Sequence, residues 1–116
     1  MAKSMKRIHN VTIERMVDKS PDTSWLGEYS KRMEQLNAGD WCFIGIRAKA
    51  EVTLADPVTQ TVSSGGLWGI ESDSDRAYFE SIEQEELAEL SNQLHAAGFS
   101  KRAIAAAFKN VERKES

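Results

Sequence analysis

The chain has 116 residues, 41% hydrophobic and 28% charged, with a formal net charge of −3. These values are ordinary for one soluble globular domain. The single cysteine, Cys42, excludes an intrachain disulfide and a cysteine-based zinc site. No apolar stretch approaches the roughly 18 residues of a membrane span, and the basic start has no apolar run behind it, so we expect no signal peptide and an intracellular protein.

The first half predicts a strand and a short helix. Residues 1–9 are expected to form a flexible arm. The β-branched residues of 10–17 predict a strand, which a polar loop with one proline follows. The apolar spacing within 28–37 predicts a short amphipathic helix, and Gly39 stands where a helix stop is expected.

The clearest pattern lies in 41–54, where apolar residues alternate with polar ones. This period of two predicts a long strand with one buried face. The residues of 60–71 predict a second strand, so that the two form a β-hairpin. Gly65-Gly66 falls inside it and indicates a bulge or a close backbone approach. Trp68 and Ile70 share one parity, which places both in or near the core.

Helical patterns fill the last third. Ser72 or Asp73 is expected to cap a segment over 74–97, as one bent helix or as two, 74–81 and 82–97, because the apolar spacing breaks after Ile82. Gly98-Phe99 is typical of a helix stop, and Ser100 is expected to cap a last helix, 101–111.

The predicted fold class is therefore α+β. A three-stranded antiparallel sheet with a long central hairpin is packed by three to four helices, and the chain ends in a C-terminal helical hairpin. The single domain is expected to cover 10–112, with a tail at 113–116.

No catalytic, cofactor or metal motif is complete. The acids after Gly69 alternate as in a calcium loop, but the pattern fails at its sixth and twelfth positions, Arg76 and Ile82. The two histidines lack ligand spacing, and the glycine-rich stretch lacks the lysine of a phosphate loop. Cys42 lies on the apolar parity of its strand, which indicates a structural thiol. We therefore expect no enzyme and no cofactor.

Charge is unevenly distributed, which suggests a partner surface, although a solvated helix face explains it equally well. Between Glu71 and Glu89, eight acids stand against one base. The predicted protein-binding residues are Trp68, Glu71, Asp73, Asp75, Glu80, Glu83, Glu86 and Glu89. A helix-turn-helix outline within 90–111 gives the alternative, nucleic-acid binding. Its residues would be Lys101, Arg102, Lys109, Arg113 and Lys114.

Four stretches, 20–30, 41–48, 64–75 and 98–100, also carry a family resemblance. With its block Gly65-Gly66-Leu67-Trp68-Gly69-Ile70-Glu71-Ser72, the chain resembles a family of small proteins of phages, plasmids and integrative elements that has no established activity. In that family a longer segment usually follows the region of Tyr29. The resemblance implies a mobile element in the cytoplasm of a bacterial host, where such acidic proteins often inhibit defence systems, including CRISPR. The leading hypothesis is thus a non-enzymatic protein that binds a host protein through its acidic surface. The host protein expected from the resemblance is a nucleic-acid-binding defence component.

Overall fold

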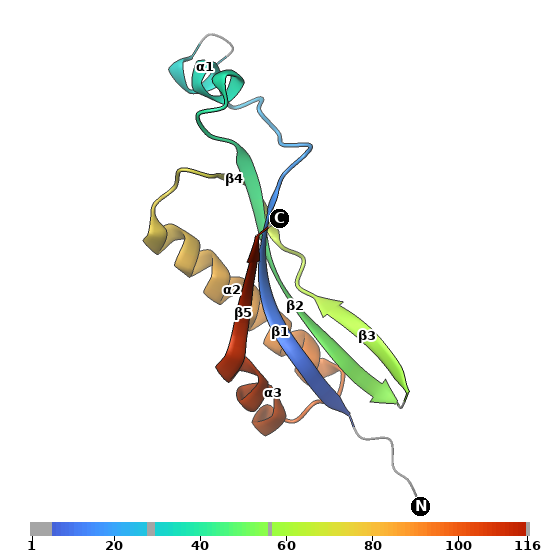
Figure 1. Ribbon diagram of the computed structural model, residues 1–116. Coiled ribbons are helices and arrows are strands. Elements are labelled where there is room, and N and C mark those ends of the chain that lie inside the picture. Colours follow the sequence, from blue (N-terminus) through green and yellow to red (C-terminus); the bar gives the residue numbers. More distant parts are fainter. Residues whose placement is uncertain (1–5, 28–29, 56, 116) are drawn as a thin grey trace, which may run out of the picture.

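The computed structural model describes residues 6–27, 30–55 and 57–115, and within them the chain is α+β (Figure 1). The five strands described are β1 (Arg7–Val17), β2 (Phe43–Ala55), β3 (Val58–Ser63), β4 (Leu67–Glu71) and β5 (Val111–Glu115). The described helices are α1 (Lys31–Ala38), α2 (Arg76–Ala96) and α3 (Lys101–Ala107), and the short 3-10 helix η1 (Phe108–Asn110) follows α3.

The strands form one mixed sheet with β2 at its centre. β1 pairs antiparallel with one side of β2, while β3 and β4 share the other side. β3 lies beside the second half of β2, and β4 lies beside the first half. β5 joins the outer side of β1 in parallel, with Val11 opposite Val111. Among the described strands, β5, β3 and β4 each pair on one side only, so each of the three leaves an open edge.

The predicted three-stranded antiparallel sheet and C-terminal helical hairpin are wrong. α3 ends at Ala107, and residues 111–115 form the parallel strand β5 instead of a helix end and a tail. The outer edge of β1 offers unpaired backbone groups, which a strand can satisfy and a helix cannot. Two of the three predicted strands are present at similar places, and the third, 60–71, is divided into β3 and β4.

The other elements begin or end near their predicted residues. β1 begins at Arg7, so 7–9 of the predicted arm lie in a strand, and residues 1–5 lie outside the described part of the chain. The helix predicted at 28–37 is α1, and its first two predicted residues also lie outside. α2 is one helix, and its N-cap is Asp75, not Ser72 or Asp73.

Two apolar clusters stabilise the sheet. In the larger one, alternate residues of β2 from Ile46 to Val52 pack with Leu90 and Leu94 of α2. The smaller one joins Trp41 and Phe43 to α1, on the opposite parity of the strand. The start of β2 is therefore covered on both sides. We call the sheet face that turns away from α2 and α3 the open face.

Candidate protein-binding surface

Trp68 lies on the open face, not in the core. Ile70 is buried in the larger cluster, whereas Trp68 is 43% exposed. Between them, Gly69 has a φ of 74°, in the left-handed region that favours glycine. This conformation breaks the alternation of the strand, so residues of one parity point to opposite faces.

The indole of Trp68 packs closely against the sheet because Gly45, which lies beneath it, has no side chain. A Cβ at Gly45 would overlap with the six-membered ring of Trp68, so that ring occupies the space above Gly45. The indole Nε1 also donates a long hydrogen bond of 3.4 Å to the carbonyl oxygen of Gly65. One side of the ring is thus fixed by the sheet while much of the ring remains exposed.

A shallow hollow of about 580 Å³ lies beside this ring. Met16, Val17, Lys19 and Trp68 line it, and we call these four residues the Trp68 surface. The lining is mostly apolar, since it includes Val17, whose side chain is 51% exposed, and Lys19 adds a positive charge at the rim. Exposed tryptophan beside aliphatic side chains is typical of the centres of protein interfaces.

Glu83, a predicted contact residue, lies inside the fold. Its side chain is 2% exposed and accepts hydrogen bonds from Arg15 Nη2 at 3.0 Å and Arg113 Nη2 at 2.8 Å. Burial alone would raise the pKa of Glu83, but the hydrogen bonds and charges of Arg113 and Arg15 outweigh it, and the pKa is lowered. This carboxylate joins α2 to β1 and β5.

Glu86 is also engaged inside the fold. Its Oε1 accepts hydrogen bonds from the Ser64 hydroxyl at 2.7 Å and the Gly66 N–H at 2.8 Å. The same Ser64 hydroxyl oxygen accepts the N–H of Ala48 at 2.9 Å. Gly66 has a φ of 83°. The glycines between β3 and β4 thus allow the backbone to approach a buried carboxylate of α2. This contact is the close backbone approach predicted for Gly65-Gly66.

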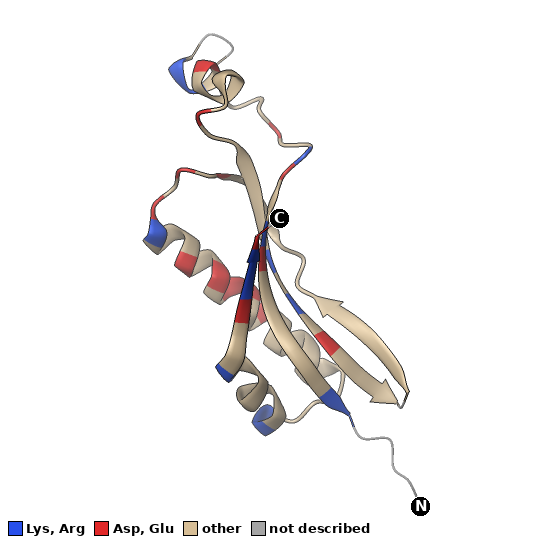
Figure 2. Ribbon diagram, viewed as in Figure 1, with Lys and Arg blue, Asp and Glu red and all other residues tan. Residues whose placement is uncertain are grey.

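Figure 2 shows acidic residues along α2, which passes close to the basic residues of β5. Phe79, Glu83, Glu86, Leu90 and Leu94 are all buried and follow one another at spacings of three and four. They form a single helical stripe toward the core, in which two carboxylates take apolar positions. In the sequence, the apolar spacing breaks after Ile82 because Glu83 and Glu86 occupy the next positions that face the core.

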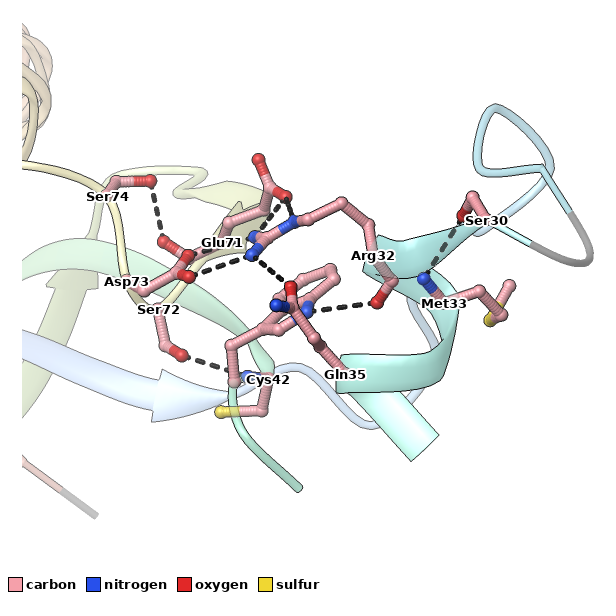
Figure 3. Close-up of polar contacts among 10 residues, drawn as sticks. Ser30, Arg32, Met33, Gln35, Cys42, Glu71, Ser72, Asp73 and Ser74 are labelled. Atoms are coloured by element: carbon pink, nitrogen blue, oxygen red, sulfur yellow. Dashed lines mark hydrogen bonds and ion pairs between the residues drawn. The ribbon is translucent and has the colours of Figure 1, made fainter. Parts of the chain in front are cut away.

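Glu71 and Asp73 bind Arg32 of α1 (Figure 3). Arg32 donates to Glu71 Oε1 at 2.5 Å and to Asp73 Oδ2 at 2.8 Å, and its guanidinium lies 4.0 Å above the ring of Trp41. The hydrogen bond from Arg32 lowers the pKa of Asp73, and the hydrogen bonds that Arg32 donates to Asp73 and Glu71 raise the pKa of Arg32. These two acids therefore attach α1 to the end of β4.

The other predicted acids lie at the surface in local contacts. Asp75 caps α2 by accepting the N–H of Tyr78 at 2.8 Å. Glu80 pairs with Arg76 one turn earlier, and both side chains are exposed. Glu89 is exposed and accepts a long hydrogen bond of 3.4 Å from Gly65 N–H. The structure thus does not gather the predicted acids on one free face.

The predicted nucleic-acid residues lie on three elements. Lys101 and Arg102 begin α3, Lys109 lies in η1, and Arg113 and Lys114 lie in β5. Arg113 pairs with Glu83, and this contact raises the pKa of Arg113. α3 has only seven residues and leads through η1 into a strand. The basic residues are therefore not arranged along one recognition helix.

Comparison of the chain with protein-family models, with curated proteins and with solved structures gives no match. The family resemblance stated from the sequence stays a prediction. Within residues 6–27, 30–55 and 57–115, no three His, Cys, Asp or Glu side chains are placed to hold a metal ion. In the same ranges, no helix has the length and apolar character needed to cross a membrane.

Proposed function

We propose that this chain is a non-enzymatic protein-binding protein whose main contact is the Trp68 surface. The observation that carries the proposal is the exposed indole of Trp68, held in place over Gly45. A side chain that is already ordered loses little conformational entropy on binding. Such a tryptophan, beside Val17 and Met16, is suited to be the anchor of an interface.

The acids then have a secondary role in binding. Glu71, Asp73, Glu83 and Glu86 have internal partners, so a partner would have to break these contacts to use them. The exposed acids of α2 that remain at the surface are Glu80, Glu85 and Glu89. These three would steer a basic partner and affect the association rate more than the dissociation rate.

The test is affinity capture from a bacterial lysate, followed by binding measurements with the captured protein. Trp68→Ala is expected to weaken binding by roughly 30-fold, the loss of a hot spot worth about 2 kcal/mol. Lys19→Glu changes the rim of the same hollow without touching the core, and it should also change affinity.

Tyr78→Ala is the matched control, since Tyr78 is an aromatic residue of α2 that is 48% exposed. We expect its affinity to equal that of the wild type. Equal affinity of Trp68→Ala, Lys19→Glu and the wild type for every captured protein would show that the Trp68 surface is not the contact. The captured proteins also test whether the partner is a nucleic-acid-binding component of a host defence system, a prediction that rests on the resemblance alone.

Nucleic-acid binding is the second candidate, supported by exposed cations. In the described part of the chain, Lys101, Arg102, Lys109 and Lys114 are exposed and have no ion pair within 4 Å. Contacts between such cations and phosphates make affinity fall steeply with salt. A titration of DNA and RNA at low salt tests this: absence of measurable, salt-sensitive binding removes the second candidate.

A further inference from the structure

The open edges at β5 and β3 differ in chemistry. β5 carries four charged residues in its five positions, whereas β3, Val58–Ser63, carries none in its six. Charged side chains on an edge strand hinder pairing with another chain. Among the described residues, no helix or strand lies beyond the outer side of β3 (Figure 1). The β3 edge is thus neutral, rich in β-branched residues and uncovered.

The register shows which backbone groups of β3 point outward. Ser64 donates its N–H to the carbonyl oxygen of Ala48 at 2.8 Å, and the pairing continues in step to Thr59. Because hydrogen-bonded pairs alternate in an antiparallel ladder, Val62 and Gln60 bond to β2. The N–H and C=O groups of Thr59, Thr61 and Ser63 therefore point away from the sheet.

We propose that the β3 edge is a self-association site, which pairs antiparallel with β3 of a second copy of this chain. Centred on Thr61, a two-fold axis places Thr61 opposite its counterpart and Thr59 opposite the counterpart of Ser63. Each of these pairs exchanges two backbone hydrogen bonds, so every outward group of the three residues is used. The facing side chains are hydroxyls, which pair well across strands, and no like charges meet.

A second copy fits this edge better than a charged peptide, because a neutral strand offers such a peptide no complementary charge. The two-fold axis is perpendicular to the sheet, so both open faces lie on the same side of a continuous sheet. The dimer would thereby present two Trp68 surfaces in one direction. The pairing itself does not depend on the Trp68 surface, and Trp68→Ala should leave it unchanged.

Sedimentation of the full chain over a concentration series tests the proposal. A six-residue pairing buries little area, so we expect a monomer–dimer equilibrium with a dissociation constant on the order of 100 μM. Amide exchange followed by NMR tests the register. In the dimer the N–H groups of Thr59, Thr61 and Ser63 should be protected along with those of Gln60 and Val62. At low concentration only the outward amides should exchange fast.

Thr61→Pro removes the outward donor and leaves the bonds to β2 intact, so it should be monomeric and folded. Thr61→Lys keeps the backbone and places two like charges at the axis, and it should weaken the dimer at least tenfold at low salt. Thr61→Val is the matched control and should dimerise like the wild type. A wild type that stays monomeric at about 1 mM, or a dimer that persists in both Thr61→Pro and Thr61→Lys, would overturn the proposal.

Discussion

Replacing Glu83 with glutamine should destabilise the protein by about 2 kcal/mol. The substitution keeps the shape of the side chain but removes the charge that pairs with Arg15 and Arg113. Breaking a fully buried ion pair costs about 3–5 kcal/mol. Arg113 is 63% exposed and is hydrated again when its partner is lost, so the loss of its ion pair with Glu83 costs about 1 kcal/mol or less. Arg15 is 29% exposed and lies 4.8 Å above the ring of Phe79, so it carries the larger share.

Urea unfolding followed by tryptophan fluorescence measures this loss. With a slope of about 1.5 kcal/mol/M, the midpoint should fall by about 1.3 M. Glu85→Gln is the matched control, since Glu85 is an exposed residue of the same helix, and its midpoint should not move. If Glu83→Gln unfolds within about 0.5 kcal/mol of the wild type, the carboxylate does not hold β1 and β5 to α2.

Three further predictions concern the same contacts. Gly45→Ala should displace Trp68 and cost about 1–3 kcal/mol in urea unfolding, while Gly65→Ala, whose Cβ would meet only Glu89 Oε1 at 3.7 Å, should cost less. Ser64→Ala removes the acceptor for Ala48 N–H and the donor to Glu86, and should cost about 1–3 kcal/mol by the same assay. Because the folded-state pKa of Glu83 is lowered, its contribution is present above its ordinary pKa of 4.5 and is lost as pH falls through the folded value. From about pH 5 to about pH 3 the wild type should therefore lose more stability than Glu83→Gln, and equal losses would contradict this.

The sequence predicts elements well where one periodicity governs a segment. Alternation along β2 identified its buried face from Ile44 to Leu54. The stop at Gly98-Phe99 is confirmed by a φ of 101° at Gly98 and by the bond from Phe99 N–H to Leu94 O. Ser100 caps α3 as predicted. These features are local, so the residues that determine them lie within a few positions of one another.

Features that depend on distant partners were not predictable in this way. β5 is a charged edge strand with no alternation of its own, and its place is set by the open edge of β1, about a hundred residues earlier. Glu83 is separated by 68 positions from Arg15. A helix pattern with an acid at a core position does not say which base will neutralise it. The outward turn of Trp68 depends on the left-handed conformation of Gly69, which no hydrophobic period encodes.

The acidic stretch therefore has a structural role that changes how binding experiments must be read. Glu83 joins α2 to two strands, Glu86 joins it to the turn between β3 and β4, and Glu71 with Asp73 holds α1. Reversing these charges would lower binding by unfolding the protein, whether or not the acids contact a partner. Only the exposed residues of α2 separate the two effects. A contact through charge would be lost in a Glu80, Glu85 and Glu89 triple lysine variant, whereas a contact centred on Trp68 would keep most of its affinity.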